Sequence, residues 1–495
     1  MIFSTYEFIF LFLPIAFFGY FYLNKKRLTT ASKAWLVVTS LFFYSWWNAV
    51  YLPLILISML FNYVVGGSLS KGRYSKKRPS RKLMLIFGII SNLALLGYFK
   101  YADFLIENLN YISSVQVDAL NLALPLAISF FTFQQIAYLV DSYKLETKEY
   151  DFLTYAVFVS FFPQLIAGPI VHHKEMMPQF DNSRSKIINY QNILMGLFIF
   201  SIGLFKKVII ADSLAASVSA GFDVATTLNF FEAWAVSLSY TFQLYFDFSG
   251  YVDMAIGLGL LFNIKLPVNF NSPYKARNIQ DFWRRWHMTL SRFLRDYVYI
   301  PMGGSRGGAF RLYSNLLATF VVGGIWHGAG WTFIFWGFLH GMALVIQRIW
   351  GALKIRMWTW VSWFITFNFV NVAWVFFRAK EWSDAMKVLS GMFDLREVVF
   401  PARYNFMEIL PDKYLGAMTD FSPNLKADET LILLVFCSAV IAFFFKNSME
   451  VIKYPVLLNS SGISFIKLAS YSVMLLAGLA AISLQSYTEF IYFNF

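Results

Sequence analysis

The sequence has little cysteine and little charge. Its single cysteine, Cys437, excludes an intramolecular disulfide and a cysteine metal site, and we expect it to serve helix packing. Charged residues make up 14% of the 495 residues, whereas hydrophobic residues make up 58% and the mean hydropathy is +0.55. This composition excludes a set of soluble domains and predicts a polytopic membrane protein.

Long apolar windows recur along the whole chain. We expect about 11 to 13 of them to be transmembrane helices, because each must cross about 30 Å of hydrocarbon with its backbone amides paired, which predicts an all-α fold. The net charge is +13, but the basic residues lie in short patches between windows, so they predict topology and not nucleic-acid binding. The patches at 25–33 and 71–82 are separated by two expected spans, which places both in the cytoplasm and the amino end outside.

The sequence lacks the signals of a secreted protein and of an inverted-repeat transporter. The first apolar run lacks a preceding basic region and a small-residue cleavage site, so we expect a transmembrane helix and not a signal peptide. No internal repeat is present, which removes the sequence pointer to an inverted-repeat transporter. We expect one integral membrane domain over residues 1–495, with a mixed-charge loop at 379–430 outside the membrane or at its surface.

The segment 320–341, FVVGGIWHGAGWTFIFWGFLHG, holds His327 among glycines and tryptophans. An imidazole in such an apolar segment costs free energy unless a cavity or a partner receives it. One interpretation is a histidine satisfied by a carbonyl group between helices that the glycines allow to approach closely. We favour a functional base, because neutral imidazole can take up a proton at physiological pH. His340 would lie about 220° further round the same helix, so we expect it to face away and to be structural.

A second histidine, His287, lies in the segment 278–299, NIQDFWRRWHMTLSRFLRDYVY, which we expect to form one helix capped by Asn278. Helical spacing places the charged side chains on one arc and His287 on the opposite, apolar side. The charged residues are Asp281, Arg284, Arg285, Arg292, Arg295 and Asp296. His287 is expected to point into the protein or the lipid, and the alternative is an interfacial helix whose histidine only packs.

Two carboxylates, Asp247 and Asp253, lie in the apolar run FQLYFDFSGYVDMAIG. A proton pathway and an ion pair with one of the arginines of segment 278–299 both remain open, because charges within a membrane usually pair. His172 and His173 match no zinc-ligand spacing, so we expect an interfacial loop there and no metal site.

Three runs together resemble the motifs of the membrane-bound O-acyltransferases: FQLYFDFSGYVDMAIGLG, NFNSPYKARNIQDFWRRWHMTLSRFLRDYVYIPMGGSRGG and GGIWHGAGWTFIFWGFLHG. The chain is most similar to the bacterial branch that contains the alginate O-acetyltransferase membrane subunit, with peptidoglycan and cellulose O-acetyltransferases and the teichoic-acid D-alanyl transferase nearby. The similarity is closest over 240–345 and extends to FFPQLIAGPIVHHKEMMPQF and to the ending FIYFNF at 490–495.

The resemblance implies a ring of membrane helices around a central tunnel, with His327 near its middle and His287 as the second family histidine. It implies a cytoplasmic thioester donor, acetyl-CoA or an acyl carrier, with no bound cofactor or metal. Tyr492 in the ending would accept the acyl group before an extracytoplasmic partner, similar to SGNH serine hydrolases, moves it to a polysaccharide. The alternative for Tyr492 is an interfacial aromatic anchor. The implied location is the bacterial cytoplasmic (inner) membrane.

The residues suit this chemistry. A phenol with a pKa of about 10 attacks poorly at neutral pH, and a buried base such as His327 can contribute about 10² to 10⁴-fold by removing its proton. Trp326 and Trp331 would exclude water from the thioester, and His287 would donate to the developing oxyanion or orient the donor. The further supporting residues are Asp247, Arg284 and Arg285.

The sequence therefore predicts an O-acetyltransferase that exports acetyl groups for a cell-envelope or exported polysaccharide. Three alternatives remain. The first is D-alanyl transfer to teichoic acid from a carrier protein. The second is a proton-coupled transporter or flippase that uses Asp247, Asp253 and His327 as a titrating chain. The third is a scaffold that only recruits a secreted transferase.

Overall fold

The computed structural model describes residues 1–71, 78–113, 116–146, 151–395, 429–452, 465–484 and 491. Within these ranges the regular structure is helical, with no β-strand. The prediction of an all-α membrane protein is confirmed. The loop predicted at 379–430 begins with a helix, Trp382–Phe393, and its part from 396 to 428 lies outside the described residues.

The chain contains both long helices and short helical segments. In order, the α-helices are α1 (Leu13–Lys25), α2 (Thr29–Ser45), α3 (Leu52–Lys71), α4 (Arg78–Ile112), α5 (Ile128–Tyr143), α6 (Phe152–Ser160), α7 (Phe162–Leu165), α8 (His173–Asp181), α9 (Tyr190–Leu204), α10 (Asp212–Ser219), α11 (Phe230–Leu261), α12 (Ile279–Trp283), α13 (Met288–Leu294), α14 (Ala309–His327), α15 (Trp331–Ala352), α16 (Thr359–Arg378), α17 (Trp382–Phe393), α18 (Glu429–Phe444), α19 (Ser448–Ile452) and α20 (Phe465–Leu484). Two π-helical segments bear on the site: η5 (Phe205–Ala211) joins α9 to α10, and η8 (Arg295–Tyr299) continues α13.

Seven helical segments of the described chain are long and apolar enough to cross a membrane, and two shorter apolar helices lie at 430–444 and 468–484. The seven are Glu7–Lys25, Ala49–Ser70, Ser80–Ile112, Tyr190–Val224, Phe230–Leu261, Trp331–Ala352 and Thr359–Arg378. The sequence predicted about 11 to 13 spans. Part of the difference arises because some apolar windows are broken. The window at 152–170 forms two helices, α6 and α7, which are separated at Phe161. Pro163 lies in the first turn of α7, where a backbone N–H has no partner within the helix, so the N–H that proline lacks is not needed.

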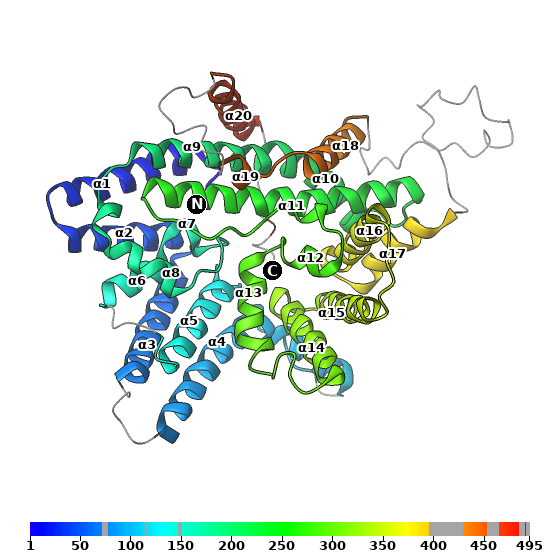
Figure 1. Ribbon diagram of the computed structural model, residues 1–495, viewed down its shortest axis with the longest axis horizontal. Coiled ribbons are helices and arrows are strands. Elements are labelled where there is room, and N and C mark those ends of the chain that lie inside the picture. The colour runs from blue at the N-terminus through cyan, green and yellow to red at the C-terminus, as the bar shows by residue number, and fades with distance from the viewer. Residues whose placement is uncertain are drawn as a thin grey trace.

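Helix α11 forms the centre of the protein. It begins with a capping box in which Asn229 and Glu232 each accept the other's backbone N–H at 3.0 Å. The most apolar window of α11 is entirely buried, whereas that of α4 is only 17% buried. In Figure 1, α11 crosses the middle of the molecule, with α1 and α2 toward one end and α14 to α17 toward the other. A helix that is apolar on all sides is suited to this enclosed position.

Helix α9 lies against α11 at backbone contact distance because glycines face each other. A Cβ atom at Gly203 would lie 2.5 Å from the carbonyl oxygen of Gly250, and one at Gly257 would lie 2.5 Å from that of Gly196. Small residues at such crossings let helices pack closely where lipid supplies no hydrophobic driving force. The two glycine pairs therefore fix how near α9 and η5 come to the central helix.

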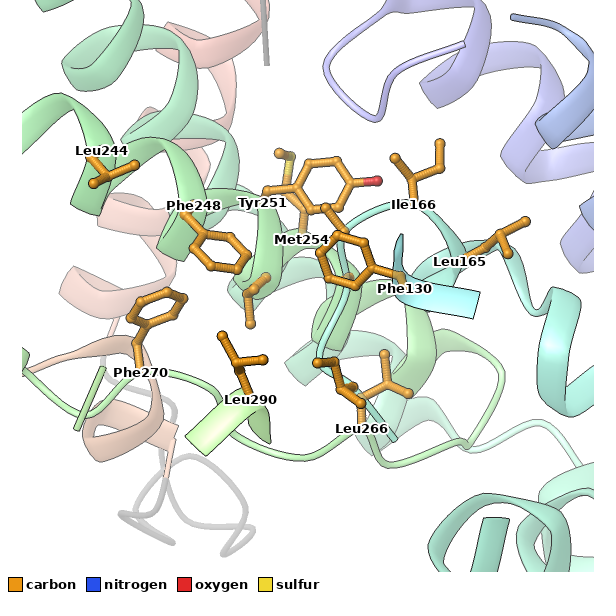
Figure 2. Packing of buried hydrophobic residues seen from close by; sticks show 14 of the residues in the cluster. Phe130, Leu165, Ile166, Leu244, Phe248, Tyr251, Met254, Leu266, Phe270 and Leu290 are labelled. Atoms are coloured by element: carbon orange, nitrogen blue, oxygen red, sulfur yellow. The ribbon is translucent and has the colours of Figure 1, made fainter. Parts of the chain in front are cut away.

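One face of α11 packs against the loop that follows it. The ring of Phe248 lies 4.9 Å from that of Phe270, and Figure 2 shows Leu290 of α13 pointing toward these two rings. All three side chains are buried. This packing holds the loop 262–278 and the start of α13 against the centre of the protein.

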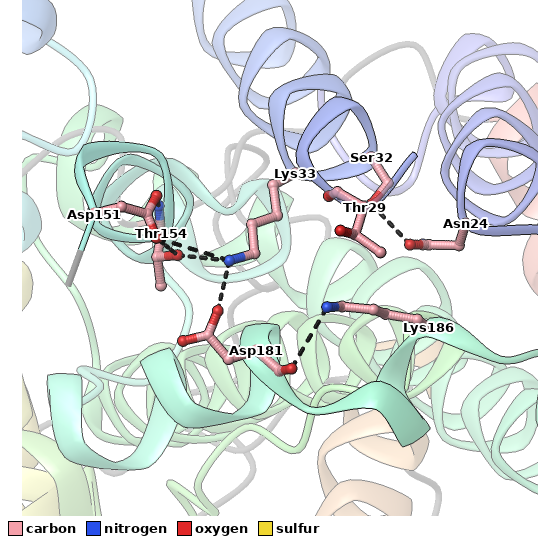
Figure 3. A network of polar contacts seen from close by, with 8 residues as sticks. All are labelled: Asn24, Thr29, Ser32, Lys33, Asp151, Thr154, Asp181 and Lys186. Atoms are coloured by element: carbon pink, nitrogen blue, oxygen red, sulfur yellow. Dashed lines mark hydrogen bonds and ion pairs between the residues drawn. The ribbon is translucent and has the colours of Figure 1, made fainter. Parts of the chain in front are cut away.

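A polar network ties together four helices at the predicted cytoplasmic turn 25–33. Lys33 of α2 donates to Thr154 Oγ1 of α6 at 2.7 Å and to Asp181 Oδ1 of α8 at 2.5 Å (Figure 3). Ser32 Oγ donates to Asn24 Oδ1 at 2.8 Å and so closes the turn between α1 and α2. The basic turn thus has a structural role in addition to its predicted topological one.

Substituting Gly203 by Leu should lower the thermal stability of the detergent-purified protein, because the side chain would meet the backbone of Gly250. Overpacking of this kind costs about 1 to 3 kcal/mol. The matched control is Gly67→Leu in α3, where a Cβ meets nothing within 4 Å. Equal melting temperatures for the two variants would contradict the close crossing of α9 and α11.

Candidate active site

His327 is the last residue of α14, and its side chain is buried. The helix ends there because Gly328 is extended, with φ −157° and ψ 154°, and α15 begins at Trp331. The prediction that His327 and His340 share one helix was wrong. The Gly-Ala-Gly sequence after His327 turns the chain and lets α15 return beside α14.

The hairpin of α14 and α15 is closed by facing glycines. A Cβ atom at Gly324 would lie 3.2 Å from the Cα atom of Gly337. The glycines near His327 therefore do serve close helix packing, which was one of the two interpretations of this segment. The packing leaves the imidazole at the inner end of the hairpin.

A lysine from another helix binds the carboxyl end of α14. Lys100 Nζ of α4 donates to the carbonyl oxygens of Trp326 at 2.7 Å and His327 at 2.9 Å, and lies 3.4 Å from Ser129 Oγ. The last carbonyl groups of a helix lack partners within it, and a cation also complements the helix dipole. Lys100 was not among the predicted site residues, although a lone lysine in the apolar run of α4 is a signal of the same kind as His327.

His287 joins α12 to α13 and lies fully buried, in the left-handed conformation with φ +42°. Asn278 caps α12 as predicted, since its Oδ1 accepts the N–H of Asp281 at 2.8 Å. The prediction of one continuous helix over 278–299 was wrong. A left-handed residue other than glycine costs about 1 to 2 kcal/mol and leaves no mark in the hydrophobic pattern.

Asn269 holds the His287 junction and fixes the protonation of the ring. Asn269 Oδ1 accepts the Thr289 N–H at 3.1 Å and the Thr289 hydroxyl at 2.9 Å, which identifies this atom as the oxygen. It lies 3.1 Å from His287 Nδ1, so Nδ1 carries the proton in the neutral ring. His287 Nε2 is buried and has no hydrogen-bond partner among the described residues. The neutral ring therefore presents a free acceptor nitrogen.

The two histidines lie side by side inside a wall of aromatic rings. The ring centroids of His287 and His327 are 6.5 Å apart. Trp326, Trp336 and Phe377 lie 4.9, 5.1 and 5.1 Å from the ring of His327. Segments far apart in the sequence thus bring the two imidazoles together in apolar surroundings.

His340 belongs to the same aromatic cluster and does not face away from it. Its Nδ1 accepts the indole N–H of Trp283 at 3.2 Å. The ring of Trp336 touches both histidines, at 4.8 Å from His340 and 5.1 Å from His327. The position of His340 differs from the expected one because the helix breaks between the two histidines.

The two tryptophans predicted to exclude water lie in different environments. Trp326 is 5% exposed and stacks on Phe133 with the ring centroids 4.9 Å apart. Trp331 is 62% exposed, and its indole donates to Asn108 at 2.9 Å. Trp331 is therefore not part of the aromatic wall, and Trp336 and Phe377 take the place that was expected for it.

Asp247 pairs with a lysine and not with an arginine of segment 278–299. Its Oδ1 lies 2.8 Å from Lys207 Nζ of η5, and both side chains are 1% exposed. Lys207 also binds Asp212 at 2.5 Å. Of the two alternatives left open, the ion pair with an arginine is wrong, because Lys206 and Lys207 follow an apolar run directly and face α11. Lys206 forms an ion pair with the second carboxylate, since its Nζ lies 2.6 Å from Asp253 Oδ2.

The arginines of segment 278–299 have other surroundings. Arg285 pairs with Asp281 at 2.8 Å, and Arg292 pairs with Glu175 at 2.6 Å. Arg284 is exposed and lines a surface cleft. Arg284 and Arg285 thus lie on the outer side of α12.

The second carboxylate oxygen of Asp247 contacts the end of the chain. Asp247 Oδ2 accepts the backbone N–H of Ile491 at 3.0 Å. Of the predicted motif at 490–495 only Ile491 is described, and Tyr492 lies outside the described residues. Asp247 therefore links the ion pair with Lys207 to the main chain of the motif at Ile491.

The interfacial loop predicted at His172 and His173 includes the start of a helix. His173 starts α8, is 2% exposed and lies 3.3 Å from Asp141 Oδ2. The hydroxyl of Tyr297 donates to Asp141 at 3.0 Å and lies 3.3 Å from His172 Nδ1. Burial lowers the pKa of His173 to about 4 and also lowers the pKa of His172. In both cases burial favours the neutral ring. Across the described ranges no group of three or more His, Cys, Asp or Glu side chains is placed to hold a metal ion.

Comparison with known proteins gives a consistent family. Residues 17–380 match the family model of MBOAT, the membrane-bound O-acyltransferase family. A peptidoglycan O-acetyltransferase of Helicobacter pylori is 49% identical, over 100% of this chain and 98% of that protein. A probable alginate O-acetylase of Pseudomonas aeruginosa is 41% identical, over 79% of this chain and 75% of that protein.

A more distant relative is the teichoic acid D-alanyltransferase of Bacillus subtilis, which is 28% identical over 52% of this chain and 70% of that protein. The family model covers most of the chain, including both buried histidines. The chain therefore belongs to the membrane-bound O-acyltransferase family and is an acyltransferase.

Proposed function

We propose that this protein transfers acetyl groups from a cytoplasmic thioester, across the bacterial cytoplasmic membrane, to a cell-envelope polysaccharide. The observation that carries the proposal is the pair of buried imidazoles of His287 and His327, with ring centroids 6.5 Å apart within aromatic walls. Similarity over the whole chain to a peptidoglycan O-acetyltransferase supports acetyl as the group and peptidoglycan as the acceptor class. The similarity to a D-alanyltransferase covers half of the chain and supports that alternative less.

In the proposed reaction His327 is the general base. It removes the proton of an acceptor hydroxyl as the oxygen attacks the thioester carbonyl, and the carbon–sulfur bond then breaks. The proton passes from the imidazolium to the departing thiolate, so the histidine returns to its neutral form. The aromatic walls of Trp326, Trp336 and Phe377 would keep water from hydrolysing the thioester.

The tautomer of His287 selects between its two predicted roles. A neutral ring with its proton on Nδ1 cannot donate from Nε2 to an oxyanion. It can accept a hydrogen bond there from an N–H or O–H group of a bound reactant. We therefore assign His287 to orienting the donor or the acceptor hydroxyl, with Asn269 as its support.

The acceptor inside the membrane is proposed to be Tyr492, which follows Ile491 in the chain. The contact of the Ile491 N–H with the buried Asp247 would anchor the motif at a defined position. An extracytoplasmic transferase of the SGNH type would then move the acetyl group from the tyrosine to the polysaccharide. The donor is acetyl-CoA or an acyl carrier thioester.

Replacing His327 by Ala should abolish acetylation of the polysaccharide in cells, because the base is lost, while leaving the amount of membrane-inserted protein normal. The measurement is the acetate released by mild base from purified polymer. The matched control is His340→Gln, which removes a histidine of the same aromatic cluster that has no role in the proposed reaction and can still accept the Trp283 N–H. Substantial acetylation in the His327→Ala strain would contradict the proposal.

Replacing Lys100 by Met should lower kcat about 10 to 100-fold with little change in KM for the donor, because His327 would lose its backbone support. The conservative variant Lys100→Arg retains a cation for the carbonyl groups and should recover part of kcat. Equal losses in both variants, or a change confined to KM, would show that Lys100 does not position the histidine.

The proposed relay predicts an acetylated carboxyl-terminal peptide. The purified protein is incubated with acetyl-CoA in the absence of any extracytoplasmic partner. The peptide that contains Tyr492 should then gain about 42 Da, the mass added by one acetyl group, because covalent catalysis leaves the transferred group on the enzyme. The label should be missing in Tyr492→Phe and His327→Ala. A wild-type peptide that remains unmodified would contradict the relay but not the general base.

A further inference from the structure

His287 cannot donate a hydrogen bond to the oxygen that becomes negative during acyl transfer. When a hydroxyl attacks the thioester carbonyl, charge develops on the carbonyl oxygen, and a fixed donor aimed at that oxygen is usually the largest contribution to catalysis. The proton of the neutral His287 ring lies on Nδ1, which is 3.1 Å from Asn269 Oδ1, and Nε2 is an acceptor. A different N–H or O–H group beside His327 therefore has to meet this charge.

Three aromatic rings contact the ring of His327, and they differ in what they can donate. Phe377, at 5.1 Å, has no N–H group in its ring. Trp326, at 4.9 Å, directs its indole N–H to the carbonyl oxygen of Ser129 at 3.4 Å. Trp336, at 5.1 Å, has a buried Nε1 with no hydrogen-bond partner among the described residues. Of these three rings, only that of Trp336 has an N–H group that is not already bonded.

The unbonded N–H of Trp336 is unusual for a side chain that is only 1% exposed. Other indole N–H groups of the described chain bind backbone acceptors. Trp35 binds the carbonyl oxygen of Ala16 at 3.1 Å, and Trp234 binds that of Met392 at 3.0 Å. A buried donor without an acceptor destabilises the fold, so it calls for an explanation. An acceptor that arrives with a reactant supplies one.

The ring of Trp336 is held firmly in place. It stacks on Trp374 with the ring centroids 5.6 Å apart and the planes 18° apart. The next residue, Gly337, fixes the backbone, because a Cβ atom there would lie 2.4 Å from the carbonyl oxygen of Phe320. Helix α15 is therefore locked at this level against α14, the helix that ends at His327. A donor that is positioned beforehand needs no reorganisation during the reaction.

Trp336 and His327 are close enough to act on the same carbon atom. Their rings meet edge to face, with the planes 89° apart. The attacking oxygen and the carbonyl oxygen are both bonded to the carbonyl carbon in the tetrahedral intermediate. The base for one oxygen and the donor for the other must consequently be neighbours, and these two side chains meet that condition.

Two more buried N–H groups of the aromatic cluster lie further from the base. One belongs to Trp374, whose ring lies against Trp336. The other is on His340 Nε2, because Nδ1 of that ring accepts the N–H of Trp283. The His340 ring lies 4.8 Å from that of Trp336. Trp374 and His340 are thus joined to His327 through the ring of Trp336, which contacts His327 directly.

We propose that the indole N–H of Trp336 donates a hydrogen bond to the thioester carbonyl oxygen and stabilises its negative charge. As the new carbon–oxygen bond forms, the π electrons of the carbonyl move to this oxygen, and His327 takes the proton of the attacking hydroxyl. The electron pair returns when the carbon–sulfur bond breaks, and the indole keeps its proton throughout. Trp336 is then a catalytic residue as well as part of the aromatic wall. The inference rests on the proposed function, because it requires acyl transfer beside His327.

The test removes the N–H of Trp336 without changing the shape of the side chain. In the variant Trp336→benzothienylalanine a sulfur atom replaces the indole N–H of the full-length protein. The single-turnover rate of acetyl transfer from acetyl-CoA should fall about 10² to 10³-fold, the range for the loss of one oxyanion donor. The affinity for acetyl-CoA should change little, because the charge develops only as the transition state is reached.

The matched control is the same substitution at Trp374, which removes a buried N–H one ring further from His327. Its transfer rate should stay close to that of the wild type. Thermal unfolding separates catalysis from structure. Because the N–H of Trp336 has no partner within the described protein, its removal should leave the melting temperature unchanged or raise it.

Three results would overturn the inference. The first is a transfer rate in the Trp336 variant within about threefold of the wild type, well below the contribution of an oxyanion donor. The second is equal slowing by the substitutions at Trp336 and Trp374. The third is a melting temperature that falls together with the rate, which would assign the N–H of Trp336 to the stability of the fold.

The outcome is separable from that of the proposed function. Full activity of the Trp336 variant beside an inactive His327→Ala protein would refute only the oxyanion donor. A His327→Ala protein that still transfers acetyl groups would refute the general base of the proposed function. A wild-type protein that transfers no acetyl group from a thioester would refute both.

Discussion

The hydrogen bonds from Lys100 to the last carbonyl groups of α14 determine where His327 can lie. In lipid, backbone carbonyl groups cannot turn to water, so a helix that ends inside the protein needs internal donors. Lys100 supplies them at 2.7 and 2.9 Å, and Tyr101 of the same helix binds the carbonyl of Ile325 at 2.5 Å. Two adjacent residues of α4 thus hold the end of α14, and the imidazole is placed as a consequence.

Buried polar groups elsewhere follow the same constraint. Asp247 and Asp253 on the central helix are matched by Lys207 and Lys206, and Asn269 satisfies the strained junction at His287. Removing one partner of such a pair leaves an uncompensated charge, which is strongly destabilising. The pairs also fix geometry, because Asp247 has one oxygen on Lys207 and the other on the main chain of Ile491. Charges within the membrane therefore connect the centre of the fold to the parts that are proposed to react.

The sequence was sufficient for the all-α membrane fold, for the two central histidines and for the family, because composition and short motifs carry that information. It could not show the breaks at His287 and after His327, since a single left-handed or extended residue does not change hydrophobic periodicity. It also could not show partners between distant helices. Lys100, Asn269 and Lys207 each act through a contact more than 15 residues away (about four helical turns), where local spacing has no meaning. The exposed position of Trp331 could not be predicted either, because it follows from the break after His327 that starts a new helix at Trp331.

We propose that the buried, aromatic-walled site with its two imidazoles performs acyl transfer with His327 as the base. The most direct test is the single-turnover rate of acetyl transfer from bound acetyl-CoA by purified protein, compared between the wild type and His327→Gln at equal occupancy of the donor. A base of this kind contributes about 10² to 10⁴-fold, so the variant should be slower by that factor while binding the donor equally well. A variant whose rate stays within about threefold of the wild type, far below the contribution expected of a general base, would contradict the claim.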